Sequence, residues 1–445
     1  MVAFAIARGP AVSEIVLLGS GMATLGSAYR LRAEGRAYTM FDRGDHPGGH
    51  TKTFTYDGGW VFDDGPHISF TEDERIQAIL AEQVAGDFHQ VPSEVNNFWQ
   101  GQWIKHPAQV NLHGLPTDLV VDCLRDFIAE STGPEREIAN YEEWLIASYG
   151  RTFAETFPMH YTRKIHTTDA KNLTADWMGP RMYRPSLEEV LRGALSPKTA
   201  DVHYIDRFRY PNRGGFYAYL RPIHEASDLR MGHEAVHIDP VAKVVRFANE
   251  ATVEYARLIS SVPVRDLVPM IAGTPPRVLE AAAALAATGT VVVNLGIDRV
   301  EDSGISWSYF YDEEFLTTRV SYPHRFSPYA TPPGTSAFQC EVYFSDKYRP
   351  LTQPLDAIID RVEHELRTCG FILPGDKVLL RDAKVSPIAG IIFDHDREAA
   401  LQAVNDYLDE LGIFRVGRFG EWRYLWTDQA FESGERAAQL ALDGH

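Results

Sequence analysis

Apolar residues near the N-terminus follow first a strand pattern and then a helix pattern. Residues 14–19 (EIVLLG) form a short apolar run that ends in glycine, and residues 22–33 then carry apolar side chains at helical spacing. A second run rich in β-forming residues, 36–42 (RAYTMFD), follows directly. Strand, tight turn, helix and strand within about thirty residues predict a βαβ unit and the beginning of a parallel sheet.

The pattern changes after residue 70. Residues 71–196 are mostly helical in pattern, and we expect a first helix to begin at Thr71, with Glu74 completing a capping box. Residues 235–262 match short strands separated by turns, and residues 278–297 match a helix, a turn and a strand. Residues 355–369 predict an amphipathic helix. Antiparallel strands that form the floor of a substrate pocket are predicted at 292–295, 307–311, 318–322 and 337–344.

These elements predict an α/β protein with a Rossmann-like dinucleotide-binding domain, built on a parallel sheet, and with inserted parts. We assign residues 1–70, 197–295 and 351–445 to the dinucleotide-binding domain. Residues 71–196 are expected to form a mostly helical substrate domain, and residues 296–350 an antiparallel sheet beside the substrate. A chain of 445 residues is long enough for such a division.

Composition narrows the classes of partner. Hydrophobic residues make up 44% and charged residues 23%, which is typical of a chain that folds throughout. Lys and Arg number 43 against 61 Asp and Glu, giving a net charge of −18, which disfavours nucleic acid and anionic membrane surfaces. The expected partner is therefore a small-molecule substrate. An anionic substrate would need a local arginine pocket.

The sequence also bears on location and on metal binding. Its first thirteen residues lack the pattern of a secretory signal, so we expect a cytoplasmic protein. The most apolar later stretch, 278–297, is interrupted by Glu280 and a Thr-Gly-Thr break, so no membrane span is expected. Cys123, Cys340 and Cys369 have no CxxC spacing, which predicts neither disulfides nor a thiolate metal site, and we expect small buried hydrophobic residues instead. No metal site is expected.

The turn after the first strand has the features of a dinucleotide site. Gly19 and Gly21 supply the first two glycines of GxGxxG, which allow a tight turn and a close approach of the backbone to a pyrophosphate. The third position is Thr24, and we expect Gly26 to relieve the crowding between helix and strand. Asp42 follows 21 residues after Gly21, where an acidic side chain binds ribose hydroxyls. The alternative is a turn with a purely structural role.

Other catalytic motifs do not occur in the sequence. It contains no GxSxG elbow, no HExxH helix and no phosphate-binding P-loop. Nucleophilic hydrolases, zinc proteases and P-loop NTPases are therefore excluded.

The choice of dinucleotide comes from a family resemblance. Residues 15–51, including the glycine pair before His50, resemble the flavin-binding start of the superfamily that contains amine oxidases, protoporphyrinogen oxidase, phytoene desaturases and UDP-galactopyranose mutase. Residues 64–71 (DGPHISFT) are most similar to the mutase segment that holds a histidine, here His67, beside the flavin. Residues 157–177 and 417–424 resemble further mutase segments, the latter their C-terminal flavin-binding motif. The resemblance implies FAD as the cofactor.

The resemblance and the glycine turn together give a set of candidate residues. Residues 318–320 (TRV), followed by Phe326, are similar to the place where mutases present an arginine to the substrate diphosphate, so His67 and Arg319 are the catalytic candidates. The residues expected to bind FAD are Gly19, Gly21, Met22, Ala23, Asp42, Arg43, Gly48, Gly49, His50, Gly65, Pro66, Val262, Gly417, Arg418, Trp422 and Asp428.

Each of these residues also has an ordinary structural interpretation. His67 either tunes the flavin or is a structural histidine, and Arg319 either clamps a phosphate or pairs with nearby Glu313 and Glu314. Residues 422, 424 and 426 are aromatic with period two, which predicts a strand whose aromatic face is either core or a cofactor wall.

Departures from the mutase pattern leave the activity open. Phe70 occupies the position where bacterial mutases have a second histidine. Residues 385–387 (VSP) lie near the position in the sequence where the mutases have a tyrosine. Arg207 and Arg209 are out of register with the second diphosphate arginine, and residues 258–263 resemble the oxidase branch.

The leading hypothesis is a mutase-like enzyme on a nucleotide-linked sugar, in which N5 of the reduced flavin attacks the anomeric carbon. The alternatives are an oxidase or desaturase that passes hydride to FAD, and a flavin-binding protein without catalytic activity.

Overall fold

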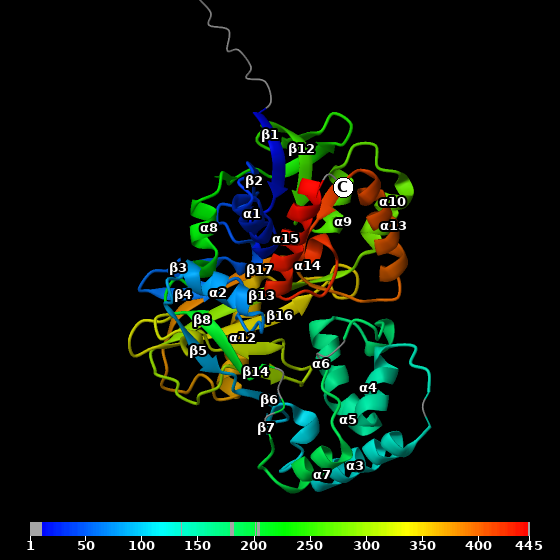
Figure 1. Ribbon diagram of the computed structural model, residues 1–445. Helices are drawn as coiled ribbons and strands as arrows, with labels where there is room; N and C mark the ends of the chain where they lie inside the picture. The colour runs from blue at the N-terminus through cyan, green and yellow to red at the C-terminus, as the bar shows by residue number, and fades with distance from the viewer. Residues whose placement is uncertain (1–10, 135, 179–181, 201, 203–204, 444–445) are drawn as a thin grey trace, which may run out of the picture.

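The predicted N-terminal βαβ unit forms the centre of a seven-stranded sheet. The computed structural model describes residues 11–134, 136–178, 182–200, 202 and 205–443. In it β1 pairs in parallel with β2 on one side and with β12 on the other, in the order β10–β11–β12–β1–β2–β9, and β18 also pairs with β12 (Figure 1). The elements are β1 (Ala11–Leu18), α1 (Met22–Ala33), β2 (Thr39–Phe41), β9 (Leu229–Arg230), β10 (Ala235–Asp239), β11 (Val244–Phe247), β12 (Thr252–Ser260) and β18 (Ile413–Arg415).

Helices cover both faces of this first sheet. On one face α1 packs against α15 (Thr427–Asp443), and on the other α10 (Pro276–Ala284) packs beside α13 (Arg397–Glu410) (Figure 1). A Cβ atom added to Gly26 would lie 2.0 Å from the carbonyl oxygen of Phe431, and one added to Gly434 would lie 1.7 Å from that of Ala23. Gly26 therefore serves the contact between α1 and α15, and not the contact between helix and strand that we expected.

The four predicted antiparallel strands belong to a second seven-stranded sheet. Its order is β17–β13–β16–β15–β14–β6–β7, antiparallel except for the β14–β6 pair. The predicted amphipathic helix is α12 (Leu355–Thr368), whose buried residues pack with one face of β13 and β16. The strands are β6 (Val95–Trp99), β7 (Gln102–Lys105), β13 (Ala287–Ile297), β14 (Trp307–Phe310), β15 (Arg319–Ser321), β16 (Ser336–Phe344) and β17 (Val378–Ile391). The boundary we assigned at residue 295 falls inside β13.

A helical lobe lies beside the second sheet (Figure 1). It consists of α3 (Thr117–Thr132), α4 (Tyr141–Tyr149), α5 (Arg151–Thr156), α6 (Pro158–Ile165) and α7 (Leu187–Leu195) around an aromatic core. The segment 71–196 is less helical than its pattern predicted, because β5 (Phe88–Pro92), β6 and β7 precede these helices. β5 pairs with β8 (Arg207–Pro211), so the strands are stabilised by distant parts of the chain.

Two local predictions are wrong. The first helix after residue 70 is α2 (Glu74–Gln83), and its N-cap is Asp73, whose carboxylate accepts hydrogen bonds from the amides of Arg75 and Ile76. The hydroxyl of Thr71 instead accepts from the amide of Asp73. Residues 421–426 form turns and irregular backbone, with Trp422 at a φ of 52°, because its ring fills the core beneath α13.

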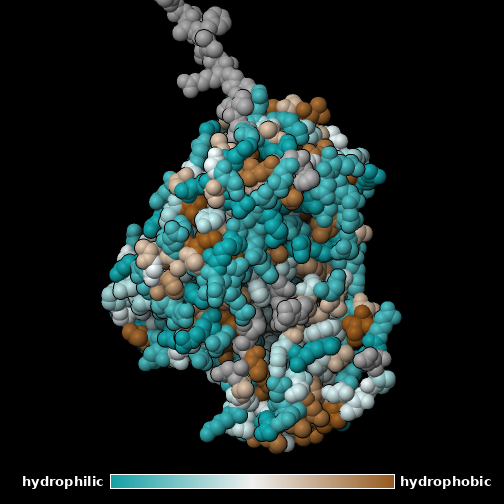
Figure 2. All heavy atoms as spheres, in the orientation of Figure 1, coloured by the Kyte–Doolittle hydropathy of each residue, from teal (hydrophilic) through white to brown (hydrophobic). Residues whose placement is uncertain are grey.

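Shorter elements connect these parts. They are β3 (Thr53–Tyr56), β4 (Trp60–Asp63), α8 (Arg221–Glu225), α9 (Val264–Leu267), α11 (Pro323–Phe326) and α14 (Gly417–Gly420). No helix among the described residues is long and apolar enough to cross a membrane. The face in Figure 2 is largely hydrophilic, and apolar residues gather at the end of the helical lobe, where Val121, Ile128 and Leu195 are exposed.

Candidate active site

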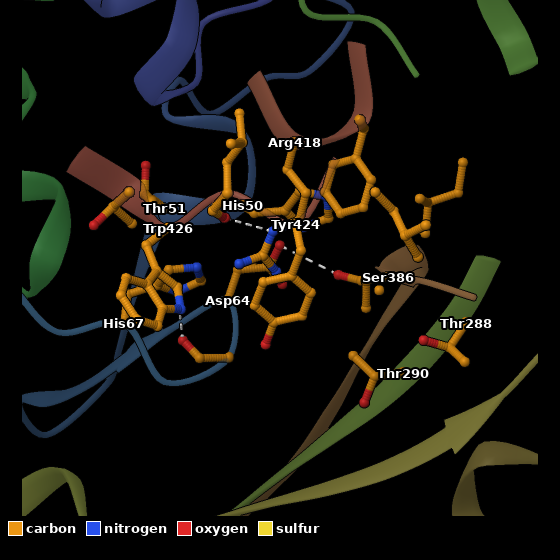
Figure 3. A pocket seen from close by; sticks show the side chains of 18 of the residues that line it. His50, Thr51, Asp64, His67, Thr288, Thr290, Ser386, Arg418, Tyr424 and Trp426 are labelled. Carbon is orange, nitrogen blue, oxygen red and sulfur yellow. Dashed lines mark hydrogen bonds between the residues drawn. The ribbon is translucent and has the colours of Figure 1, made fainter. Parts of the chain in front are cut away.

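One large cavity lies between the first sheet, the second sheet and the helical lobe. Its volume is about 940 Å³, at the upper end of the range for ligand pockets in proteins. Figure 3 shows its central part, where His50, Asp64, His67, Arg418 and Tyr424 converge from separate segments of the chain. The cavity therefore has a dinucleotide end at the first sheet and a second end between the second sheet and the helical lobe.

The dinucleotide end is formed by the predicted glycine turn. Gly19 has a φ of +104°, which favours glycine, and Gly21 is the N-cap of α1 without a side-chain capping bond. The first amides of α1 are thus available to an anion, and the helix dipole favours negative charge there. Such a site suits a pyrophosphate.

Two further glycine segments come close to the same turn. A Cβ atom on Gly49 would lie 3.2 Å from the Cα of Gly21, and one on Gly417 would lie 2.6 Å from the Cβ of Ala23. Close backbone approach from three segments forms a cradle that side chains would fill. The residues present therefore fit a dinucleotide.

Asp42 lies at the end of β2 and lines the cavity. Its Oδ2 accepts a hydrogen bond of 2.6 Å from the hydroxyl of Ser20, and its Oδ1 accepts one of 2.8 Å from the amide of Gly44. These bonds fix the carboxylate and leave it further acceptor capacity for ribose hydroxyls.

Most predicted cofactor residues meet at this cavity. The predicted residues that line it are Gly19, Gly21, Met22, Ala23, Asp42, Arg43, Gly48, Gly49, His50, Gly65, Pro66, Val262, Gly417 and Arg418, and both His67 and Arg319 also line it. Trp422 and Asp428 do not. Trp422 is fully buried in the core, whereas Tyr424 and Trp426 line the cavity in its place.

His67 is held in one tautomer. Its Nδ1 lies 2.9 Å from the carbonyl oxygen of Gly65, which can only accept, so Nδ1 carries the proton. Burial lowers the pKa of His67 to about 4, and burial likewise lowers that of His50 to about 4. Near pH 7 His67 is therefore neutral, with an acceptor lone pair on Nε2.

The loop that carries His67 is anchored by a buried carboxylate. Asp63 accepts hydrogen bonds from the hydroxyls of Thr53 (2.6 Å) and Tyr210 (2.5 Å) and from the amide of Phe216 (3.0 Å). Burial raises the pKa of Asp63 to about 6. Next to it, Asp64 lies 3.4 Å from the hydroxyl of Ser386 on β17, a contact drawn in Figure 3.

The second sheet presents alternate residues to the cavity, as the period of a strand requires. Tyr309, Arg319 and Glu341 are cross-strand neighbours on β14, β15 and β16. Tyr343, Thr290 and Ser386 are cross-strand neighbours on β16, β13 and β17. All six line the cavity.

Arg319 is paired with a residue that the sequence analysis did not consider. Its Nε and Nη2 both donate to the carboxylate of Glu341, and Nη2 lies 2.9 Å from Oε1. Tyr343 donates to the same Oε1 over 2.9 Å. Glu313 instead pairs with Arg163 and His160, so the alternative of a pair between Arg319 and Glu313 is wrong.

Sequence reasoning identified β13, β14, β15 and β16 of this wall but missed β17, and it missed Glu341, Tyr343, Thr290 and Ser386 as residues of the wall. The period-two alternation of residues 337–344 was a signal that Glu341 and Tyr343 share one face of their strand. It does not say which face meets the cavity, since that depends on where α12 packs. Arg207 and Arg209 lie on β8 and do not line the cavity.

Comparison with known proteins finds similar folds. Residues 17–83 match the family of NAD(P)-binding Rossmann-like domains. The crystal structure of reduced UDP-galactopyranose mutase superposes with a TM-score of 0.91 at 24% identity, covering 97% of this chain and 96% of the mutase. The chain has the fold of UDP-galactopyranose mutase.

Other proteins share this fold less closely. A protoporphyrinogen-oxidase-like protein from Exiguobacterium sp. superposes with a TM-score of 0.74 at 15% identity, covering 98% of this chain and 100% of that one. Putrescine oxidase bound to putrescine superposes with a TM-score of 0.64 at 15% identity and the same coverage. The lycopene-forming phytoene desaturase of Paracoccus sp. is 27% identical over 147 residues, which are 33% of this chain but only 26% of the desaturase.

These comparisons confirm the predicted α/β fold and the predicted resemblance to this flavoprotein superfamily. They agree with FAD as the cofactor, since the mutase was crystallised in a reduced form and several putrescine oxidase structures concern cofactor binding. They leave a mutase and an oxidoreductase as the two candidate enzyme types.

Proposed function

We propose that the protein is an FAD-dependent enzyme that acts on a nucleotide-linked sugar in the manner of UDP-galactopyranose mutase. The observation that carries the proposal is the continuity of one cavity. It runs from the dinucleotide end, at Gly21 and Asp42, past His67 to Arg319 in the wall of the second sheet. A site for this reaction needs a cationic side chain that binds the diphosphate beside the redox cofactor. A guanidinium can bind a phosphate through two parallel hydrogen bonds.

FAD would be held by the residues of the dinucleotide end. The amides at the start of α1 would bind the pyrophosphate, Asp42 the ribose, and the segments around His50, Gly65 and Arg418 the remainder. When bound in its reduced form, FAD supplies the nucleophilic or hydride-transferring centre that no side chain provides.

The chain's own residues would then orient the substrate and exclude water. Nε2 of His67 offers a fixed acceptor lone pair, because the Nδ1 proton is engaged by Gly65. Burial raises the pKa of Tyr161, Tyr309 and Tyr343, so their hydroxyls stay neutral. The hydroxyls of Tyr161 and Tyr309 can donate to sugar oxygens, whereas that of Tyr343 donates to Glu341 and can accept from a sugar hydroxyl. The wall of the second sheet thus combines Arg319, which is paired with Glu341, with several hydroxyl groups.

The test is anaerobic incubation of dithionite-reduced protein with a panel of nucleotide hexoses, with oxidised protein as the control. Chromatography should resolve an isomerised nucleotide sugar that forms only with the reduced protein. Absence of conversion in both redox states would contradict the mutase proposal.

The role of Arg319 has its own test. Arg319→Ala should weaken binding of the same nucleotide sugars by at least about tenfold, because a charge-assisted bidentate contact is lost. Unchanged affinity, measured by calorimetry, would remove Arg319 from the substrate site.

A second candidate function is an oxidoreductase of the amine oxidase or desaturase type. The observation that favours it is the pairing of Arg319 with Glu341, which compensates the positive charge of Arg319 at the second end of the cavity. Rapid bleaching of the oxidised flavin by an amine or an apolar substrate, in the absence of any nucleotide, would identify this activity.

A further inference from the structure

The charge of Arg319 is compensated from within the protein. Its guanidinium donates two hydrogen bonds to the carboxylate of Glu341, and the hydroxyl of Tyr343 donates a third. The side chain of Glu341 is 6% exposed, whereas that of Arg319 is 27% exposed. Since both residues line the cavity, the arginine keeps an edge open to it while most of the carboxylate is covered.

Three buried tyrosines lie close to this pair. Tyr161 on α6 and Tyr309 on β14 lie close enough to interact with Arg319, and burial raises the pKa of both hydroxyls, as it does for Tyr343. We call these three tyrosines with Arg319 and Glu341 the arginine cluster. It holds one positive and one negative charge.

A ligand diphosphate would therefore meet a guanidinium whose charge is already compensated by Glu341. Two of the five N–H groups of Arg319 donate to Glu341, so the diphosphate binds the remaining donors, and it brings its own negative charge close to that carboxylate in a poorly hydrated site. Like charges in such surroundings repel more strongly than in water.

We propose that Glu341 is a specificity-determining residue that lowers the affinity of the cavity for free diphosphates, so that tight binding requires the additional contacts of a sugar. Sugar hydroxyls supply those contacts, because they can donate to the hydroxyl oxygens of Tyr161, Tyr309 and Tyr343, an acceptor capacity that a diphosphate without donors leaves unused. This inference rests on the proposed function in one respect, namely that Arg319 faces a diphosphate.

The test replaces the carboxylate by an amide of the same shape. Glu341→Gln in the FAD-loaded full chain should bind UDP and inorganic pyrophosphate with a Kd at least tenfold lower than the wild type, which corresponds to about 1.4 kcal/mol. Isothermal titration calorimetry measures both probes. The amide oxygen can still accept from Arg319 or Tyr343, so the shape of the cluster is kept.

Two further variants isolate the cause. Glu314→Gln removes the same charge from an exposed position five residues before Arg319 and should leave both Kd values unchanged. The double variant Arg319→Gln with Glu341→Gln should not bind UDP or pyrophosphate more tightly than the wild type, because the increase in affinity depends on an uncompensated guanidinium. If Glu341→Gln does not fold, Glu341→Asp is the substitute. Its shorter side chain loosens the ion pair with Arg319, so it should bind UDP and pyrophosphate more tightly than the wild type, by less than tenfold.

The outcomes separate this inference from the proposed function. Tighter probe binding without nucleotide-sugar conversion would support the role of Glu341 and contradict the mutase proposal. Conversion by the wild type, together with unchanged or weaker probe binding by Glu341→Gln, would overturn the inference and identify Glu341 as a residue that only positions Arg319. Probe binding by neither protein would overturn it as well.

Discussion

Lys164 is a buried lysine whose ammonium group lies among backbone carbonyls. It is on α6 and donates to the carbonyl oxygens of Asp312 (2.8 Å) and Thr317 (2.7 Å), while buried Glu365 accepts from the amides of Leu316 and Thr317. The loop before Arg319 is therefore held from both sides. Neither contact follows from the sequence, because the partners lie about 150 and 50 residues apart.

This burial predicts a pH dependence of stability. Burial lowers the pKa of Lys164 to about 7, so between about pH 7 and pH 10 the unfolded chain binds a proton that the folded chain does not. The free energy of unfolding should therefore rise with pH in that window, by up to about 1.4 kcal/mol per unit from this residue. Lys164→Met should remove the rise.

Urea unfolding at three pH values between 7 and 9 measures this effect. Lys171→Met, at an exposed position, is the matched control and should keep the slope of the wild type. A slope that is equal in Lys164→Met and in the wild type would show that Lys164 is charged in the folded protein.

At the scale of elements, the contact between α1 and α15 determines how the C-terminus closes the dinucleotide site. Ser27 donates to the carbonyl of Gly434, and the hydroxyl of Ser433 accepts from the amide of Gly417. The sequence predicted α1 with its observed bounds, from helical spacing alone. It did not predict α15 as the partner, because two helices approach this closely only where glycines coincide in space.

Gly26→Ala tests this contact. In an exposed helix the change would stabilise by up to about 1 kcal/mol, but here the added Cβ would lie 2.0 Å from a carbonyl oxygen. Overpacking should dominate and lower the free energy of unfolding by about 1–3 kcal/mol. Gly375→Ala, where an added Cβ meets nothing within 4 Å, should show no such loss in thermal unfolding. Equal stability of the two variants would contradict the close contact.

At the scale of the whole molecule, the cavity is bounded by both sheets and the helical lobe. A ligand that fills this cavity binds only when both sheets and the helical lobe are folded, so its binding stabilises the three parts together.

Removal of FAD should therefore lower the melting temperature of the whole protein. Saturation at about a thousand times Kd corresponds to about 4 kcal/mol of stabilisation. Scanning fluorimetry of the apoprotein with added FAD measures it. FMN is the matched control, because it lacks the AMP part of FAD, and with it the ribose that Asp42 would bind and one of the two phosphates that the start of α1 would bind. Equal stabilisation by FMN would contradict our assignment of the dinucleotide end.

The sequence by itself determined the N-terminal βαβ unit and the glycine turn between its first strand and its helix. Strand, glycine turn, helix and Asp42 follow one another within about thirty residues, so spacing along the chain equals proximity in space. The segment that contains Gly65 and His67 could also be recognised from the sequence, through its resemblance to a mutase segment, because its residues are contiguous.

The tertiary structure alone decided the other end of the cavity. The partner of Arg319 is Glu341 on a neighbouring strand and not Glu313 nearby in sequence, because cross-strand register brings the first pair together. Trp422 went to the core and Tyr424 to the cavity, because a turn with positive φ replaced the predicted strand. Charge compensation inside a folded protein depends on register and packing, and these are properties of the assembled sheets rather than of any local pattern.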